Sequence, residues 1–233
     1  MSLQQNISYE QQNNVPATNQ LKKISPVRLF ARGGARRVLF IGNSITWHAP
    51  SPKIGWHGDW GMAASAEDKD YLHRLMAMLE ARYGTLDYGI AQLAAWESAY
   101  PDGTHLLEEQ FAEAKDFGAD LVILRLGENM KRDAAPESKP YFEAMLNFLV
   151  KDGAQVVVTD SFWRNDARDA MLKELAEERG YAFCRLSDMD SNDAYMAKGL
   201  FEHHGVSIHP GDAGMEEIAR RLMATVEAVW GEA

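Results

Sequence analysis

The chain has 233 residues, enough for one large domain or for one domain with an extension. Hydrophobic residues make up 46% and charged residues 25%, which is typical of a globular protein. The formal net charge is −10, so we expect neither a nucleic-acid partner nor binding to an anionic membrane surface. The single cysteine, Cys184, excludes an intramolecular disulfide framework and a multi-cysteine metal site.

Residues 1–35 are expected to form an N-terminal arm or extension, ahead of a domain that spans residues 36–233. From Met1 to about Pro26 the chain is polar, rich in Gln and Asn, and without sustained periodicity. This stretch has neither the basic n-region nor the apolar h-region of a signal peptide. The sequence as written is therefore expected to be cytoplasmic, or periplasmic or secreted if a leader has been removed, so the localisation stays open.

From Arg37 onward, apolar segments typical of strands alternate with segments of helical periodicity. The strand-like runs cover residues 37–42, 86–93, 120–127, 154–160 and 181–186, and the helical segments cover 68–84, 103–118, 137–153, 165–180 and 212–230. Each of the first four helical segments ends in a glycine, which is favoured just after a helix. This alternation predicts an α/β fold with a parallel sheet covered by helices on both faces.

Polar residues follow the predicted strands at the edge where ligands of open α/β sheets bind. Ser44 follows the first strand in "GNSIT", Asn129 follows the third in "GEN", and His209 precedes the last helix in "HHGVSIHPGDAGM". Nucleophilic acyl transfer needs a hydroxyl, a base and a donor for the developing oxyanion. Each residue alone is ordinary, but the placement of all three at one edge indicates such a site.

These segments resemble the SGNH hydrolase superfamily of GDSL-type esterases and lipases. "VLFIGNSIT" is similar to its first block, "LRLGENM" to its third and "IHPGDAGMEEIA" to its fifth, in the same order along the chain. The resemblance implies a three-layer α/β/α, flavodoxin-like fold with a parallel five-stranded sheet. It also implies Ser44 as nucleophile, His209 as base, and the Asn129 side chain with the main-chain amides of Ser44 and Ala95 as oxyanion donors.

The chain departs from the superfamily at the acid of the catalytic triad. Val206 stands three residues before His209, where the superfamily usually has Asp. The acid orients the imidazole and stabilises its charged form, so another group must replace it. We favour a main-chain carbonyl near Val206. The alternative is a carboxylate from elsewhere, for which the candidates are Glu202, Glu128 and Asp160.

A long connection after the first strand carries several aromatic residues. Five tryptophans follow predicted strands and are candidates for a substrate-binding wall: Trp47, Trp56, Trp60, Trp96 and Trp163. The connection could also simply be packed by its own aromatic side chains. Because tryptophan faces stack well on sugar rings, this clustering favours a carbohydrate ester over a long acyl chain. The histidines show no HExxH or His-x-His spacing, so no metal site is expected.

The sequence therefore predicts a serine esterase that removes small acyl groups, in particular acetyl, from a carbohydrate. Its partner would be a small-molecule or glycan ester, with no cofactor, no metal, no nucleic acid and no membrane. Two alternatives stay open. One is a lipase or thioesterase for longer acyl chains, and the other is a catalytically silent carbohydrate-binding protein of the same fold. The sequence does not indicate the oligomeric state.

Overall fold

A computed structural model describes residues 25–131 and 135–231 of the chain. Within these residues, a central sheet has six strands in the order β1-β3-β2-β4-β5-β6. The strands are β1 (Val27–Phe30), β2 (Arg36–Gly42), β3 (Leu86–Gln92), β4 (Leu121–Arg125), β5 (Gln155–Thr159) and β6 (Ala182–Cys184). Strands β3, β2, β4, β5 and β6 run parallel to one another. The predicted five-stranded parallel sheet is therefore confirmed.

The sixth strand, β1, lies in the segment that the sequence set apart as an arm. It pairs antiparallel with β3, from Val27 opposite Ala91 to Phe30 opposite Tyr88. The side chain of Val27 is buried in the hydrophobic core. Residues 25–35 thus contribute an edge strand to the sheet, whereas residues 1–24 of the expected arm lie outside the described residues.

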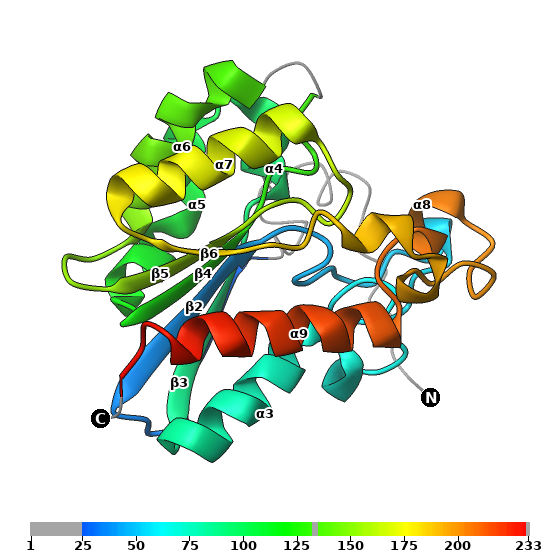
Figure 1. The fold of residues 1–233 in the computed structure, drawn as a ribbon, viewed down its shortest axis with the longest axis horizontal. Coiled ribbons are helices and arrows are strands. Elements are labelled where there is room, and N and C mark those ends of the chain that lie inside the picture. Colours follow the sequence, from blue (N-terminus) through cyan, green and yellow to red (C-terminus); the bar gives the residue numbers. More distant parts are fainter. Residues whose placement is uncertain (1–24, 132–134, 232–233) are drawn as a thin grey trace, which may run out of the picture.

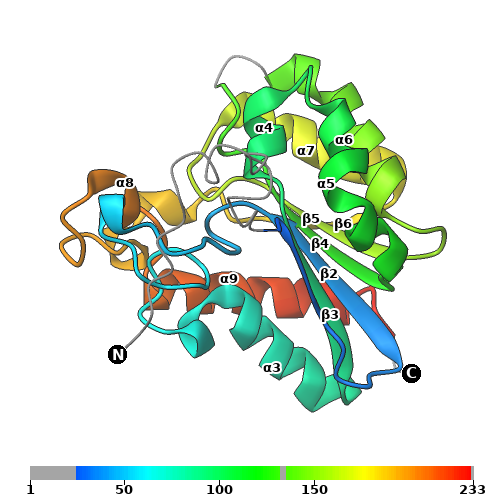
Figure 2. The same cartoon turned by 180° about the vertical axis from the view of Figure 1, so that it is seen from behind.

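Helices cover both faces of the sheet, which gives the expected three-layer α/β/α architecture (Figures 1 and 2). One face is covered by α3 (Tyr71–Tyr83) and α9 (Asp212–Glu227), and the other by α5 (Thr104–Phe117), α6 (Ala135–Leu149) and α7 (Asp166–Arg179). The short helices α4 (Ala94–Ala99) and α8 (His204–Ser207) follow β3 and precede α9. Among the described residues, no helix is both long enough and apolar enough to cross a membrane.

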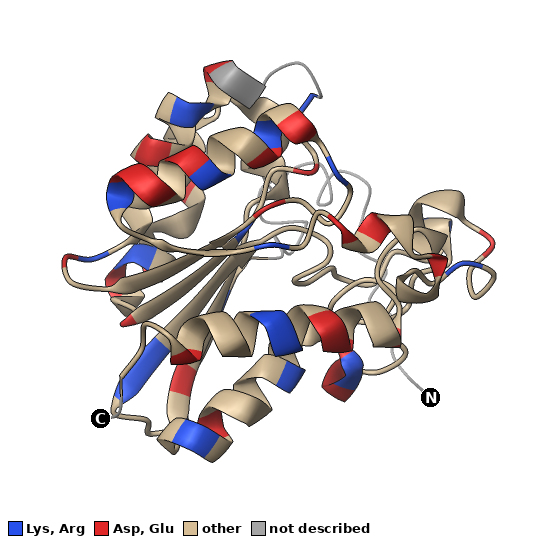
Figure 3. Ribbon diagram, in the orientation of Figure 1, with Lys and Arg blue, Asp and Glu red and all other residues tan. Residues whose placement is uncertain are grey.

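The apolar strands are explained by burial on both sides. Val38 and Phe40 of β2 belong to the core cluster under α3 and α9, whereas Leu39 and Ile41 belong to the cluster under α5, α6 and α7. Successive side chains of a strand point to opposite faces, so a strand that is covered on both faces is apolar at consecutive positions instead of at every second one. Each such burial stabilises the fold by about 1.5–3 kcal/mol relative to an exposed side chain. Charged residues lie mainly on the helices and at the strand ends (Figure 3).

The helices end at the glycines that the sequence predicted, except for α6. Gly118 and Gly180 directly follow α5 and α7 with φ of 60° and 65°, a left-handed conformation that glycine adopts without strain. Helix α6, however, ends at Leu149 and not near residue 153. The chain then makes a turn in which the Ala154 amide donates to the Lys151 carbonyl at 3.2 Å, and Gly153 has a φ of 81° within this turn.

Candidate active site

Ser44 lies in a tight turn directly beyond the carboxyl end of β2. The main-chain amides of Thr46 and Trp47 both donate to the carbonyl of Asn43, at 2.9 and 3.0 Å. A Cβ atom at Gly42 would collide with the Thr46 side chain, so the chain needs glycine at this point. Ser44 itself is partly exposed, while Asn43 is buried. The turn therefore presents the Ser44 hydroxyl above a rigid strand end.

His209 contacts this hydroxyl. The distance between Ser44 Oγ and His209 Nε2 is 2.9 Å, and the distance between His209 Nδ1 and the Gly205 carbonyl oxygen is 2.6 Å. A carbonyl oxygen can only accept a hydrogen bond. Nδ1 therefore carries the proton of the neutral imidazole, and this N–H group donates a hydrogen bond to the Gly205 carbonyl. Nε2 is then unprotonated and accepts from Ser44. The group that accepts from Nδ1 is thus a main-chain carbonyl. The sequence analysis favoured such a carbonyl near Val206 over a side-chain carboxylate.

The side-chain candidates for the acid lie elsewhere. Glu202 is exposed on the surface. The Glu128 side chain is 2% exposed and turned into a buried polar cluster below the site. Asp160 accepts main-chain amides that follow β6. In this structure the group that accepts from His209 Nδ1 is the Gly205 carbonyl, and not one of the alternative carboxylates.

Val206 has a packing role at the position of the missing acid. Its side chain has no exposed surface and lies in an apolar cluster with Trp56, Met62, Ala63 and Ala197. This cluster joins the long connection after β2 to the segment that carries α8. The apolar contacts hold in place the same short helix whose Gly205 carbonyl accepts from His209.

The surroundings of His209 keep its imidazole neutral. Burial lowers the pKa of His209 to about 4, and the positive charge of Arg125 acts in the same direction. The ring of Trp163 stands edge-on to the imidazole, with 4.9 Å between the ring centroids. The Trp163 indole N–H donates to the carbonyl of Ile208 at 3.1 Å, which holds the indole in place. A neutral imidazole with a free Nε2 can take the proton of a serine hydroxyl.

The expected oxyanion donors sit at the neighbouring strand ends. Asn129 is exposed, and its Nδ2 atom donates to Glu97 Oε2 at 2.6 Å. Ala95 is in the first turn of α4, where main-chain N–H groups have no acceptor within the helix. Among the described residues, neither the Ala95 nor the Ser44 amide donates to a main-chain carbonyl in a turn, loop or helix cap. These donors come from the ends of β4, β3 and β2, respectively.

A buried polar cluster, of which the sequence analysis singled out only Glu128, lies beneath these groups. It consists of Asn43, Glu97, Arg125 and Glu128. Asn43 Nδ2 donates to Glu97 Oε1 at 3.2 Å and to Glu128 Oε2 at 2.7 Å, and its side-chain oxygen accepts from Arg125. Arg125 has no exposed surface and pairs with Glu128 at 2.6 Å. The sequence carries one sign of this cluster, which is the arginine inside the apolar run "DLVILRLG". A buried arginine needs a carboxylate partner, so this residue indicates a carboxylate beside it.

The two carboxylates of the cluster differ in their charge state. Burial alone would raise the pKa of Glu128, but the charges of Arg125 and Arg168 outweigh it and leave that pKa below its usual value. Burial and the charge of Glu128 raise the pKa of Glu97 to about 7, against the hydrogen bonds that it accepts. The cluster therefore holds one firmly ionised carboxylate and one that titrates near neutral pH.

Trp96 does not belong to a substrate wall, contrary to expectation. Its side chain has no exposed surface and lies in the core on the face covered by α5, α6 and α7. It packs edge-on against Phe142, with 5.5 Å between the ring centroids. Helix α4 buries Trp96 and Glu97, whereas Ala95 and Ser98 are exposed.

The other four tryptophans divide into two pairs. Trp47 and Trp56 are 5% and 2% exposed, and their indole N–H groups donate to Asp59 and to the His48 carbonyl. These two pack the long connection itself, as the simpler interpretation held. Trp60 and Trp163 keep part of their surface exposed. They remain candidates for substrate contact.

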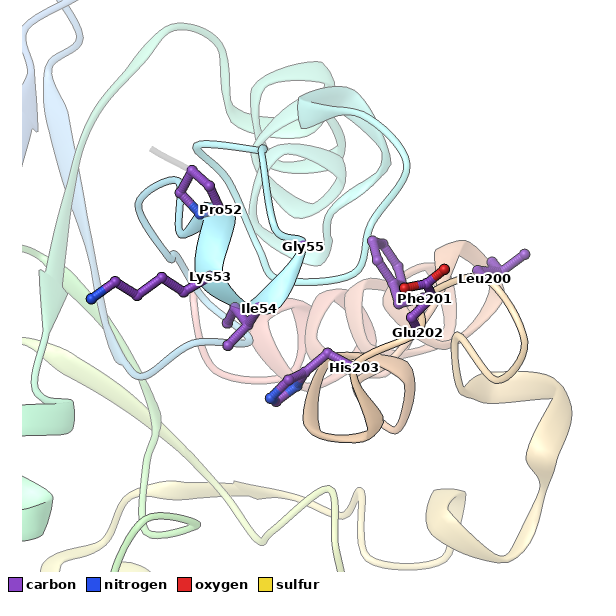
Figure 4. A pocket seen from close by; sticks show the side chains of 8 residues that line it. All are labelled: Pro52, Lys53, Ile54, Gly55, Leu200, Phe201, Glu202 and His203. Atoms are coloured by element: carbon purple, nitrogen blue, oxygen red, sulfur yellow. The ribbon is translucent and has the colours of Figure 1, made fainter.

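Two depressions lie near these elements. A pocket of about 310 Å³ adjoins Asn129, and its lining residues are Glu97, Ser98, Tyr100, Pro101, Asn129, Lys131 and Glu137. A separate cleft of about 580 Å³ lies between residues 52–55 and residues 200–203. Figure 4 shows Ile54 on one wall of this cleft and Phe201, Glu202 and His203 on the other. No group of three or more His, Cys, Asp or Glu side chains within residues 25–131 and 135–231 could hold a metal ion.

Several known structures have a fold similar to that of this chain. The crystal structure of TesA is 16% identical, with a TM-score of 0.55 over 83% of this chain and 99% of that chain. The psychrotrophic esterase EstA from Pseudoalteromonas sp. is 10% identical, with a TM-score of 0.55 over 83% and 97%. A two-domain esterase (CEX) active on acetylated mannans is 15% identical, with a TM-score of 0.56 over 85% of this chain and 50% of that chain.

At these identities the structural likeness shows the shared fold. No curated protein matches the sequence. A sequence profile of the GDSL-like Lipase/Acylhydrolase family, in contrast, matches residues 40–217, which is well over half of the chain. This match includes Ser44, Asn129 and His209. The chain belongs to the GDSL-like lipase/acylhydrolase family, and its fold is that of the SGNH hydrolases.

Proposed function

We propose that the protein is a serine esterase that removes acetyl or similarly small acyl groups from a carbohydrate. The observation that carries this proposal is the 2.9 Å contact between Ser44 Oγ and His209 Nε2, together with the 2.6 Å contact between His209 Nδ1 and the Gly205 carbonyl. A hydroxyl, a base and a group that orients the base are thus in line. The arrangement is the functional equivalent of a triad in which a carbonyl stands in for the acid.

The reaction follows from these contacts. Ser44 Oγ attacks the ester carbonyl carbon while its proton moves to His209 Nε2. The negative oxygen of the tetrahedral intermediate accepts hydrogen bonds from Asn129 Nδ2 and from the Ser44 and Ala95 amides. The carbon–oxygen bond to the sugar then breaks, and His209 donates its proton to the leaving alcohol. Water attacks the acyl-serine with His209 again as base, which releases the acid and restores Ser44.

The Gly205 carbonyl has a defined part in these steps. It accepts a hydrogen bond from the Nδ1–H group throughout, so the imidazole keeps the ring orientation and the tautomer that leave the Nε2 lone pair available. A carbonyl dipole stabilises the imidazolium less than a carboxylate does, because it carries no net charge. The low pKa of His209 agrees with this difference.

The choice of a small acyl group and a polar alcohol rests on the surroundings of Asn129. The adjoining pocket of about 310 Å³ is lined largely by polar and charged side chains, among them Ser98, Lys131 and Glu137. Trp60 and Trp163 offer partly exposed aromatic surface. Such surroundings suit a sugar hydroxyl and an acetyl group better than a long alkyl chain. The structurally similar esterase active on acetylated mannans makes this substrate class plausible for the fold.

Covalent labelling and turnover test the proposal together. A fluorophosphonate should label the parent protein at Ser44 but not the Ser44→Ala variant, and hydrolysis of p-nitrophenyl acetate by that variant should fall by about 10⁴-fold or more. The matched control is Ser191→Ala, since Ser191 is an exposed serine whose hydroxyl donates only to the Asp188 carbonyl. A Ser44→Ala variant that hydrolyses the ester as fast as the parent would refute the assignment.

The length of the acyl chain and the nature of the alcohol are tested separately. We expect kcat/KM to be higher for p-nitrophenyl acetate than for the octanoate, and we expect release of acetate from an acetylated polysaccharide. A preference for octanoate would favour the lipase or thioesterase alternative. A parent protein that resists fluorophosphonate and yet binds the polysaccharide would favour the catalytically silent alternative.

A further inference from the structure

We propose that Glu97 is a positioning residue for the oxyanion site, because its buried carboxylate holds the Asn129 amide group in the orientation that leaves one N–H free for the substrate oxygen. This inference rests on the proposed function, since it assigns to Asn129 the role of oxyanion donor. Glu97 does not touch the substrate oxygen in this arrangement. It acts through Asn129.

The contacts of Glu97 tie together the ends of three strands. Glu97 lies in α4, which follows β3, and it is 1% exposed. Its Oε2 atom accepts from Asn129 Nδ2 at 2.6 Å, and its Oε1 atom accepts from the Gly127 amide at 2.5 Å. Oε1 also accepts from Asn43 Nδ2 at 3.2 Å, directly before the nucleophile. One side chain thus fixes the loop after β4 relative to the turn that carries Ser44.

The chemistry of a carboxylate decides which way the Asn129 amide faces. An ionised carboxylate can only accept hydrogen bonds, so the Asn129 atom next to Glu97 must be the nitrogen and not the oxygen. The nitrogen carries two N–H groups, of which one is used by Glu97. The second remains for a developing oxyanion. With the amide reversed, the Asn129 oxygen would face the oxyanion and repel it.

Protonation of Glu97 would weaken this orientation. A protonated carboxyl group has a donor in place of one acceptor position, and Oε1 and Oε2 are both occupied by donors. The charged groups that face Glu97 are Glu128 and Arg125, from β4 and the loop after it, and Lys131 and Glu137 line the same pocket. Burial and the charge of Glu128 raise the pKa of Glu97 to about 7. We therefore expect a partial loss of kcat as the pH falls below neutrality.

A double-mutant cycle on kcat tests the inference. Asn129→Ala should lower kcat by about 10²–10³-fold, which is typical for the loss of one oxyanion donor. Glu97→Gln keeps the size of the side chain but places an amide N–H against one of the present donors. It should lower kcat by at least about 10-fold with KM unchanged, since the interaction develops in the transition state. In the Asn129→Ala background, Glu97→Gln should lower kcat by less than about 3-fold.

Two further measurements separate positioning from general stability. The acid-side step in kcat near pH 7 should be absent from Glu97→Gln. The control is Asp120→Asn, which removes a carboxylate at the opposite edge of the sheet, where Asp120 accepts from the Arg37 amide at 2.8 Å and pairs with Lys151. That variant should unfold more readily and keep the kcat of the parent.

The outcomes distinguish this inference from the proposed function. If Asn129→Ala leaves kcat unchanged, the oxyanion assignment in the proposed function fails. If Asn129→Ala lowers kcat but Glu97→Gln has the same effect with and without Asn129, the positioning role of Glu97 is overturned. If Glu97→Gln does not fold, the pH profile of the parent decides. A kcat that stays constant from about pH 8 to about pH 5 overturns the inference.

Discussion

Replacing Val206 with Asp restores the residue type of the superfamily and should nevertheless damage the protein. Val206 has no exposed surface and packs among Trp56, Met62, Ala63 and Ala197. The Gly205 carbonyl already accepts from His209 Nδ1. A carboxylate at position 206 would therefore enter an apolar cluster, with no donor there to receive it. We expect Val206→Asp to be strongly destabilised and no more active than the parent.

The size of the effect follows from burial. Removing the buried isopropyl group costs about 2 kcal/mol, which is also the expected cost of Val206→Ala. An aspartate without a partner must stay neutral at pH 7, so its pKa must rise by roughly 3 units, which costs about 4 kcal/mol more. The total of about 6 kcal/mol is comparable to the whole stability of many domains.

Urea unfolding of the parent, Val206→Ala and Val206→Asp measures these differences. Because the aspartate pKa is raised in the folded state, the folded Asp variant holds a proton that the unfolded chain releases above about pH 4. The extra penalty of Val206→Asp over Val206→Ala should therefore be absent below about pH 4 and grow as the pH rises to 7. A Val206→Asp variant as stable as Val206→Ala, with kcat/KM above the parent, would show that position 206 faces the imidazole and would refute the reasoning.

Three other predictions follow from the site. Burial lowers the pKa of His209 to about 4, so the neutral base persists on acidification and kcat/KM should vanish only near pH 4. A complete loss centred near pH 6.5 that persists in Glu97→Gln would contradict this. Trp96→Ala should cost about 3–5 kcal/mol in urea unfolding with KM unchanged. Trp60→Ala should raise KM for the glycan at a smaller cost in stability, and the reverse pattern would restore Trp96 to the substrate wall.

The layered fold could be predicted because the central strands are buried on two faces. Such a strand is apolar at consecutive positions, as Val38–Ile41 are, and the helices between the strands must carry one apolar stripe each. The edge strand β1 was less apparent. It has only four residues, of which one is buried and one is exposed, so its run of apolar residues is too short to stand out.

The order of the motifs also predicted that Ser44, Asn129 and His209 lie at one site, since parallel strands bring their carboxyl ends to one edge whatever the details of packing. The tryptophans could not be sorted in this way. Trp96 and Trp163 both follow a strand, but the short helix α4 turns Trp96 into the core, and the loop after β5 leaves Trp163 beside His209. Burial depends on the direction of a side chain, which the residue type does not encode.

The partner of His209 was decided by the tertiary structure alone. A missing Asp is visible in the sequence at Val206, but a main-chain carbonyl has no residue signature, because every residue carries one. Gly205 becomes the acceptor only because α8 packs against the connection after β2 and aims that carbonyl at Nδ1. The same holds for Glu97, whose contacts with Asn43 and Asn129 join residues far apart in the sequence. The sequence by itself determined the fold and predicted the groups that we propose to react, and packing decided which groups orient them.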